Sequence, residues 1–310
     1  MKIVFLDADS LGNDADYSEF KQLGEVIKYP LSSPWQVPER IEDADVIVVN
    51  KVPVNEETIS LAQHLKLVCV SATGTNNLDK DYLDRRKIAW RNAAGYSTDS
   101  VAQHTFAMLF YLMEGLRYYD DYVRDGSYAN SPLFTHFGIP FHELANVTWG
   151  ILGLGAIGRK VADIAKAFGA RVIYYSASGA PAQKGYEQVD FDTLLSESDI
   201  LSVHAPLNEY TENLMNADAF SKMKSDAILL NLGRGPIINE ADLADALNSG
   251  RIRAAGLDVL CTEPMEDDCP LFHVKDKSRL LITPHVAWAA VEARQKLMKI
   301  VAENIREYFR

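Results

Sequence analysis

The stretch that decides the fold is Gly153-Leu154-Gly155-Ala156-Ile157-Gly158, which directly follows the apolar run Thr148–Leu152. The next segment, Arg159–Phe168, has the spacing of an amphipathic helix. Between a buried strand and a helix, the first glycine permits a tight turn and the second lets the backbone approach a pyrophosphate. The third glycine lets helix and strand pack closely. The pattern predicts a dinucleotide-binding loop whose cofactor-binding residues are Gly153, Gly155, Ala156, Ile157 and Gly158.

Short apolar runs alternate with helix-like segments on both sides of this loop. Near-continuous apolar strands joined by helices are typical of a parallel sheet covered on both faces. We therefore expect an α/β protein with two doubly wound parallel sheets: a Rossmann-type cofactor domain of six strands and a smaller, flavodoxin-like domain. The strands expected in the first domain are Lys2–Leu6, Glu25–Tyr29, Asp45–Val49, Leu67–Val70 and Ile88–Asn92. Those expected in the second are Val147–Leu152, Arg171–Tyr175, Ile200–His204, Ala227–Asn231, Ala254–Val259 and Leu280–Thr283.

The composition narrows the functional classes. The chain has 310 residues, of which 31 are Lys or Arg and 43 are Asp or Glu, so its formal net charge is −12. Nucleic acids are gripped mainly by basic side chains, so we expect no nucleic-acid partner. We also expect no membrane association and no secretory signal, because the apolar runs are short. Three cysteines without paired spacing predict no metal site and favour a cytoplasmic location, and the roles of Cys261 and Cys269 stay open.

A long helix is predicted to begin at Ser100. The segment Ser100–Gln103 has the form of a capping box, and the apolar residues that follow cover more than one side of the helix. Such a helix needs a second packing partner, which is either another domain or another subunit.

The second strand of the cofactor domain ends at Ser176, where an acidic residue usually binds the ribose 2′-hydroxyl of NAD. A hydroxyl there removes the repulsion that excludes a 2′-phosphate, yet no arginine follows immediately to bind one. We therefore expect NAD(H) or NADP(H) as cofactor and leave the choice between them open.

Three further segments of the cofactor domain carry polar residues at predicted strand ends. They are Asn231–Pro236, Gly256–Pro264 and Thr283–Trp288. In an open parallel sheet, ligands bind beyond the carboxyl ends of the strands. Arg234, Glu263 and His285 are therefore expected to meet in one crevice.

Together with the glycine-rich loop, these segments resemble the D-isomer-specific 2-hydroxyacid dehydrogenases. The resemblance covers essentially the whole chain, including Ser71–Asp79 and Asn92–Ser97. Within that family, the ending Pro284–Trp288 is most similar to glycerate dehydrogenases/hydroxypyruvate reductases.

The resemblance implies a division into domains and a reaction. Residues 1–98 plus 288–310 would form the substrate-binding domain, and residues 99–287 the dinucleotide-binding domain. The reaction would transfer a hydride between a nicotinamide cofactor and a small D-2-hydroxy acid or 2-keto acid, with D-glycerate/hydroxypyruvate or glyoxylate favoured. A homodimer is also implied.

The chemistry of that reaction gives the three polar residues their expected roles. His285 is the natural proton donor, because imidazole titrates near neutral pH, and Glu263 would favour its charged form. Arg234 offers a planar fork that suits a carboxylate and polarises the adjacent ketone. The other histidines, His104 among them, are assigned structural or solvated roles.

The remaining site residues line the cofactor or the substrate. Asp258 would hold the nicotinamide carboxamide, as the resemblance implies, or would instead cap a turn. Consecutive amides in the first domain would bind the substrate carboxylate, and Tyr96 or Asn50-Lys51 are open alternatives for lining that pocket. The expected substrate-binding residues are Ala72, Thr73, Gly74, Arg234 and His285, and the further cofactor-binding residues are His204, Ala205, Pro206, Leu232, Gly233 and Asp258.

Two other functions stay open at this stage. One is a D-lactate-type dehydrogenase, which would act on pyruvate. The other is a non-catalytic NAD(H)-sensing protein, similar to the corepressors that share this fold and keep the Arg, Glu and His. No basic extension for docking a partner is present, which favours the enzyme. The physiological direction of the reaction is also left open.

Overall fold

Apolar runs of four or five residues form the central strands of two parallel sheets. The computed structural model describes every residue from Met1 to Arg310. The chain divides into unit 1, which comprises Met1–Ser97 and Ala289–Arg310, and unit 2, which comprises Thr98–Trp288. Each unit builds its own sheet. The roles of the two units, substrate binding for one and cofactor binding for the other, stay predictions.

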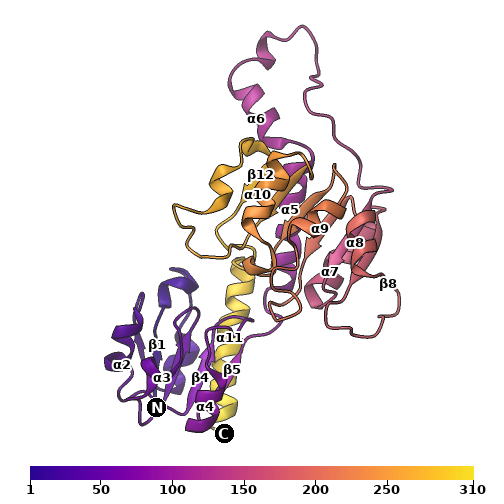
Figure 1. Cartoon of the computed structure of the whole chain (residues 1–310). Coiled ribbons are helices and arrows are strands. Elements are labelled where there is room, and N and C mark those ends of the chain that lie inside the picture. The colour runs from indigo at the N-terminus through magenta and orange to yellow at the C-terminus, as the bar shows by residue number, and fades with distance from the viewer. The chain divides into compact units, whose positions relative to one another are not determined.

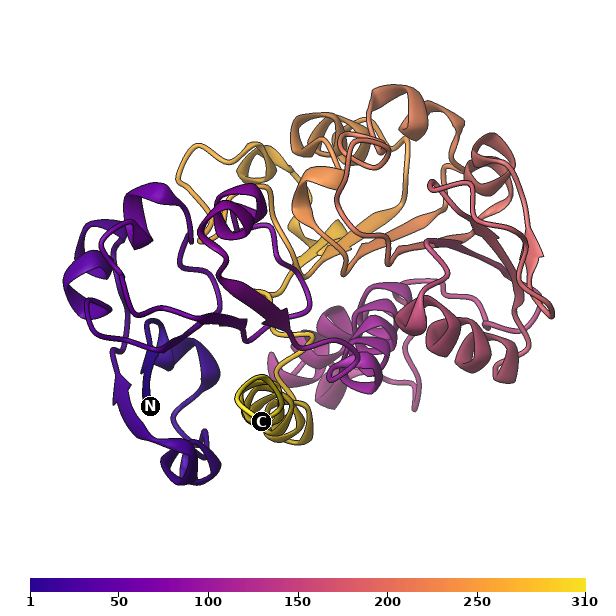
Figure 2. The ribbon, with the colours of Figure 1, turned by 90° about the horizontal axis from the view of Figure 1, so that it is seen from below.

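Unit 1 has a five-stranded parallel sheet in the order β2-β1-β3-β4-β5. This is the flavodoxin-like order, as expected. In the view of Figure 2, α11 lies along one face of the sheet, where it contacts β4 and α1. The strands are β1 (Lys2–Phe5), β2 (Glu25–Lys28), β3 (Val46–Val49), β4 (Leu67–Val70) and β5 (Ala89–Asn92). The helices are α1 (Ser18–Leu23), α2 (Val37–Arg40), α3 (Glu56–Ile59), α4 (Lys80–Arg86) and α11 (Val291–Tyr308), with short 3-10 helices η1 (Ala8–Leu11) and η2 (Pro34–Gln36).

Unit 2 has a seven-stranded parallel sheet in the order β12-β11-β10-β9-β6-β7-β8. With β6 as the first strand, β8-β7-β6-β9-β10-β11 has the doubly wound dinucleotide-binding order 3-2-1-4-5-6, and β12 adds a seventh strand at one edge. The predicted α/β fold class is therefore confirmed. The two-residue strand β8 was not expected. The strands are β6 (Thr148–Leu152), β7 (Arg171–Tyr175), β8 (Glu187–Gln188), β9 (Ile200–Val203), β10 (Ile228–Asn231), β11 (Ala254–Leu257) and β12 (Leu280–Ile282).

Helices cover both faces of the second sheet (Figure 2). Helices α5 and α7 pack together on one face, and α8, α9 and α10 lie on the other. None of the helices is both long and apolar enough to cross a membrane. The helices are α5 (Thr98–Met113), α6 (Leu116–Arg124), α7 (Ala156–Ala167), α8 (Phe191–Glu197), α9 (Ala217–Lys222) and α10 (Glu240–Asn248). The 3-10 helices are η3 (Tyr128–Asn130), η4 (Gly235–Ile237), η5 (Pro270–His273) and η6 (Lys277–Arg279).

The start of α5 differs from the expected capping box. The helix begins at Thr98, two residues before Ser100, so Ser100 lies inside the first turn and its hydroxyl donates to the Ala287 carbonyl at 2.6 Å. The wide apolar surface of α5 is covered within unit 2, because Val101, Phe106 and Leu109 are buried in the core that α7 and the sheet share. This helix therefore gives no reason of its own to expect a second subunit.

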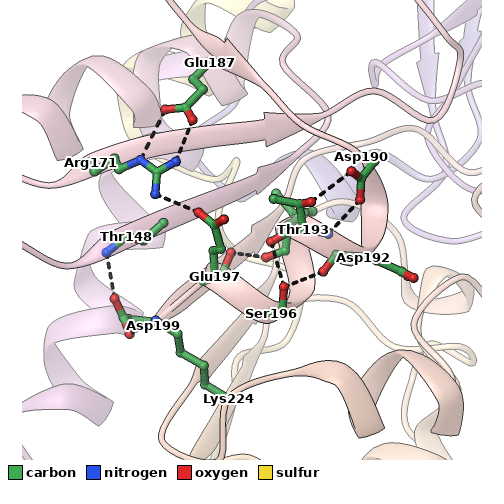
Figure 3. A network of polar contacts seen from close by, with 12 residues as sticks. Thr148, Arg171, Glu187, Asp190, Asp192, Thr193, Ser196, Glu197, Asp199 and Lys224 are labelled. Atoms are coloured by element: carbon green, nitrogen blue, oxygen red, sulfur yellow. Dashed lines mark hydrogen bonds and ion pairs between the residues drawn. The ribbon is translucent and has the colours of Figure 1, made fainter.

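The amino ends of the strands are held by a network of charged groups (Figure 3). Arg171, the first residue of β7, pairs with Glu187 at 2.6 Å and Glu197 at 2.7 Å. Asp199, just before β9, accepts from the Thr148 amide and from the Lys224 ammonium group. These groups are partly exposed, so each pair contributes little to stability. The carboxyl ends of the strands lie at the opposite edge of the sheet, away from this network.

Candidate active site

The glycine-rich loop lies between β6 and α7. Gly153 has φ +95°, a conformation that favours glycine, and a Cβ built on it would lie 2.7 Å from the backbone of Ala205. A Cβ on Gly158 would lie 2.3 Å from the Gly153 carbonyl oxygen, so the third glycine does allow close packing of helix and loop. Helix α7 begins at Ala156, earlier than the expected Arg159, and Gly155 is its N-cap.

Gly155 is the residue that could admit a ligand. A Cβ built on it would have no neighbouring atom within 4 Å, and its φ of −74° suits any residue. Nothing in the protein itself therefore requires glycine at this position. The N-terminus of a twelve-residue helix adjoins it and offers free amides and the positive end of a dipole. We predict that a pyrophosphate fills this open space.

His204 follows β9 at the same edge of the sheet. Its amide donates to the Leu152 carbonyl at 2.8 Å, but neither ring nitrogen has a hydrogen-bond partner and both are buried. Burial lowers the pKa of His204 to about 3, so the ring is neutral at pH 7. A buried polar group without a partner costs about 1–3 kcal/mol. A bound molecule that carries hydroxyl groups, such as the riboses of a dinucleotide, would remove that cost.

The expected position of the 2′ group lies at the end of β7. The hydroxyls of Ser176 and Ser178 lie 3.2 Å apart; Ser176 is partly exposed and Ser178 is exposed. Arg159, in α7, donates to the Leu154 carbonyl and to the Gln183 side chain. None of these groups is a carboxylate, so none of them repels a phosphate.

The structure brings Glu263 and His285 together. The Glu263 carboxylate lies 2.7 Å from His285 Nδ1, and its other oxygen accepts from the Leu260 amide. Because an ionised carboxylate only accepts, Nδ1 carries the proton of this bond, which leaves Nε2 to exchange a proton with a ligand. About a quarter of each side chain is exposed, 25% for His285 and 27% for Glu263. The pair is therefore ordered by its own contact and still reachable.

Arg234 lies on the neighbouring loop, directly before η4. Asn231 holds this loop from both sides, because its side chain accepts from the Gly233 amide and donates to the Arg234 carbonyl. A Cβ on Gly235 would lie 1.9 Å from the carbonyl carbon of Leu260, so the loop packs directly on the segment that carries Glu263. Sheet register therefore brings Arg234 and Glu263 onto adjoining loops.

Asp258 is 2% exposed, and its carboxylate is occupied within the protein. It accepts from the Thr283 hydroxyl at 2.6 Å and from the amides of Val286 and Ala287 at 2.9 Å each. These contacts make it the anchor of the loop that carries His285. Binding of the nicotinamide carboxamide by Asp258 stays a prediction.

In unit 1, the expected carboxylate-binding segment follows β4. Thr73 is fixed by two side-chain bonds: its hydroxyl donates to the Ala93 carbonyl, and its own carbonyl accepts from the Asn92 side chain. The amides of Thr73 and Gly74 donate to no group of the protein. These two amides are available to an anion.

In unit 1, the loop of residues 50–52 is anchored by a buried carboxylate. The buried carboxylate of Asp7 accepts from the amides of Asn50, Lys51 and Val52 at 2.7–3.3 Å. Burial raises the pKa of Asp7, and these three bonds oppose that shift. The loop that carries Asn50 and Lys51 is thus held rigidly, and Tyr96 is buried. Contact of Tyr96 or Asn50-Lys51 with a substrate stays a prediction.

Sequence reasoning gives His104 a structural or solvated role and does not place it beside the loop that carries His285. His104 Nε2 lies 3.1 Å from the Thr283 hydroxyl and 3.6 Å from the Asp258 carboxylate, although 179 residues separate His104 from Thr283. One signal was present in the sequence. Ser100 and His104 are polar residues one turn apart on a helix whose remaining surface is largely apolar.

Comparisons with known proteins identify relatives of this chain. Residues 106–287, more than half of the chain, match the model of the "D-isomer specific 2-hydroxyacid dehydrogenase, NAD binding domain". The chain is 38% identical to the hydroxypyruvate reductase of Blautia hydrogenotrophica, a match that covers 100% of this chain and 97% of that protein. It is 36% identical to the glycerate dehydrogenase of Methylorubrum extorquens, over 99% of this chain and 96% of the relative.

Among solved structures, the chain is similar to an acyclic imino acid reductase in complex with NADPH and D-Arg. The TM-score is 0.89 at 31% sequence identity, and the match covers 100% of this chain and 97% of the other. The similarity therefore extends over both units.

The glycine-rich loop yields a prediction that separates folding from binding. In Gly155→Ala, the added methyl meets no protein atom, so we expect the melting temperature to stay within about 1 °C of wild type while NADH affinity falls at least about tenfold, because the methyl fills the space for the pyrophosphate. Thermal unfolding and a titration of NADH fluorescence measure the two effects. Gly153→Ala is the control and should lower both quantities, because its methyl meets Ala205. Unchanged NADH affinity in Gly155→Ala would place the pyrophosphate elsewhere.

Proposed function

The chain belongs to the D-isomer-specific 2-hydroxyacid dehydrogenase family, and we propose that the 2-keto acids it reduces are hydroxypyruvate and glyoxylate. Members of this family are nicotinamide-dependent oxidoreductases that transfer a hydride between the cofactor and a D-2-hydroxy or 2-keto acid. The observation that supports the proposed substrates is the identity of 36–38% to a hydroxypyruvate reductase and a glycerate dehydrogenase, over nearly the full length of each.

The residues of unit 2 fit the chemistry of keto-acid reduction. When bound, the nicotinamide supplies the hydride for the C2 carbonyl carbon. His285 Nε2 donates a proton to the carbonyl oxygen, and Glu263 holds Nδ1 and stabilises the imidazolium before transfer. Arg234 binds the substrate carboxylate and polarises the ketone through the same guanidinium group. In the oxidative direction, the same His285 nitrogen accepts the hydroxyl proton.

Unit 1 would contribute to carboxylate binding. We propose that the Thr73 and Gly74 amides, together with Ala72, donate to one substrate oxygen. The support is that both amides are unused within the protein, while the Thr73 side chain and carbonyl are both fixed. Backbone amides can bind an anion in a chain whose net charge is negative, because they act only at short range.

The substrate proposal predicts rapid oxidation of NADH or NADPH with hydroxypyruvate, slower oxidation with glyoxylate and the slowest with pyruvate. In His285→Gln, kcat should fall by about 10²–10⁴, the usual loss for a missing acid–base group, while the Kd of the coenzyme stays within about twofold. Loss of absorbance at the nicotinamide band measures turnover, and fluorescence titration measures binding.

Two control outcomes decide between the remaining functions. Fastest turnover with pyruvate would favour a D-lactate-type dehydrogenase. Coenzyme binding without turnover of any of the three acids would favour the sensing protein. Full activity of His285→Gln would exclude this residue as the proton donor.

For the coenzyme, we propose that NADPH is accepted as well as NADH. The support is the pair of hydroxyls at Ser176 and Ser178, where a carboxylate would otherwise repel a 2′-phosphate. Ser176→Asp should lower kcat/KM for NADPH at least about tenfold, because like charges a few ångströms apart repel strongly, and should leave NADH turnover nearly unchanged. Steady-state kinetics with both coenzymes test this, with Ser178→Ala as control. Equal turnover of NADPH by Ser176→Asp would contradict the proposal.

We also propose that the protein is a homodimer formed through α6 and the segment after it, residues 116–142, which we name the arm. Figure 1 shows the arm standing away from the sheet of unit 2. Its returning segment is fixed on α6, because the rings of Tyr122 and His136 stack at 3.9 Å and the Tyr119 hydroxyl donates to the Ile139 carbonyl. The arm nevertheless exposes eight large apolar side chains: Leu116, Tyr118, Val123, Tyr128, Leu133, Phe134, Phe137 and Phe141. Exposed apolar patches of this kind mark interaction surfaces.

The arm predicts the assembly state. Wild type should sediment as a dimer, and Phe134→Asp combined with Phe137→Asp should sediment as a monomer, because these rings, 89% and 90% exposed in one chain, would be buried by a partner. Trp35→Asp is the control, since this residue is 78% exposed and lies in unit 1. A wild-type monomer, or a double variant that still dimerises, would contradict the proposal.

A cytoplasmic location is consistent with this function. The three cysteines are free, as is usual in a reducing compartment.

A further inference from the structure

A chain of polar groups connects α5 to the loop of residues 283–287, which carries His285. His104 Nε2 lies 3.1 Å from the Thr283 hydroxyl oxygen, which lies 2.6 Å from the Asp258 carboxylate. Since the carboxylate only accepts, the Thr283 hydroxyl must donate its one hydrogen to it. The Thr283 oxygen therefore accepts from His104, and the proton of His104 sits on Nε2. The direction of every bond in the chain follows from these valences.

Asp258 carries this connection to both amides that follow His285. One carboxylate oxygen accepts from the Val286 amide and the other from the Ala287 amide, each at 2.9 Å. On the preceding side, the His285 amide donates to the Thr283 carbonyl at 2.9 Å. The backbone of His285 is thus held before and after the residue by groups that meet at Thr283 and Asp258.

These hydrogen bonds matter because His285 has φ +53°, in the left-handed region that non-glycine residues rarely adopt. Such a conformation is strained and persists only where the surroundings impose it. The direction in which the imidazole leaves the loop depends on this backbone conformation. Glu263 fixes one ring nitrogen, but a single hydrogen bond does not fix the backbone.

Helix α5 provides the rigid support for this chain. Ser100, one turn before His104 on the same face, donates to the Ala287 carbonyl at 2.6 Å. The apolar residues of α5 are buried against the sheet and α7. Helix α5 therefore contacts the loop at two points, through Ser100 and through His104.

We infer that His104 is a positioning residue for the reaction: through Thr283 and Asp258 it holds the backbone of the loop so that His285 is aimed at the substrate. It touches neither substrate nor cofactor in this role. The inference rests on the proposed function in one respect, namely that His285 is the proton donor.

The test compares three variants in the full-length protein. His104→Leu removes the donor, His104→Gln restores an N–H group near the position of Nε2, and Thr105→Val is the matched control. Thr105 is the next residue of α5, is fully buried, and bonds only within the helix, to the Val101 carbonyl. Thr105→Val should therefore weaken the helix without touching the loop.

Two readouts separate positioning from general destabilisation. In His104→Leu, kcat with hydroxypyruvate should fall about tenfold or more, because a misplaced catalytic group is costly, while KM and the Kd of NADH stay within about twofold. Hydrogen exchange of the Val286 and Ala287 amides should become at least about tenfold faster, since those amides are protected by the chain of bonds. His104→Gln should recover most of both losses, and Thr105→Val should lower the melting temperature and leave both readouts unchanged.

Each other outcome overturns the inference. Unchanged exchange at Val286 and Ala287 in His104→Leu would show that His104 does not hold the loop. Faster exchange with unchanged kcat would show that the contacts of His104 with the loop do not position His285. Equal changes of kcat and of amide exchange in Thr105→Val would show that His104→Leu acts only by destabilising the protein. His285→Gln is measured beside them. Full activity of that variant would contradict the proposed function, while the exchange readout would still judge the role of His104 in holding the loop.

Discussion

The parallel alignment of the strands in unit 2 is the constraint on which its chemistry depends. Because all strands run in one direction, the residue that follows each strand reaches the same edge of the sheet. Six strands are followed there by residues of the site or its support: Gly153, Ser176, His204, Leu232, Asp258 and Thr283. Pairing one strand antiparallel would send its successor to the opposite edge, where the Arg171 and Asp199 networks lie. The direction of the strands therefore determines where the candidate site lies, before the identity of any side chain does.

The local parts of this arrangement could be predicted from the sequence, and the long-range parts could not. The ends of β6 and β7 follow from apolar runs that stop at a glycine or a serine, and the roles of Gly153 and Gly158 follow from their spacing. Ser100 shows the limit of such reasoning. Its side chain fits a helix cap equally well, but its actual partner is the Ala287 carbonyl, 187 residues away. Hydrogen-bonding partners so distant along the chain leave no periodic signal, so the contact of His104 with Thr283 was also missed.

The electrostatics of the chain explain why binding groups are local. A net charge of −12 repels an anionic substrate and an anionic coenzyme at long range. We expect attraction to come instead from groups that act at contact distance, namely the guanidinium of Arg234, the N-terminus of α7 and the unused amides of Thr73 and Gly74. Such groups are oriented by the fold, so each one discriminates by geometry as well as by charge.

Two carboxylates five residues apart divide the control of one histidine. Glu263 is partly exposed and bonds the ring of His285, so it governs which nitrogen carries the proton and how the ring is turned. Asp258 is buried and accepts from the amides of Val286 and Ala287, so it fixes the position of the backbone from which the ring extends. Neither task substitutes for the other, because rotation of a ring about its side-chain bonds cannot correct a displaced backbone. A histidine on a loop in a left-handed conformation requires both to be held in one orientation, and a buried carboxylate needs donors of its own, which Thr283 and the loop amides supply.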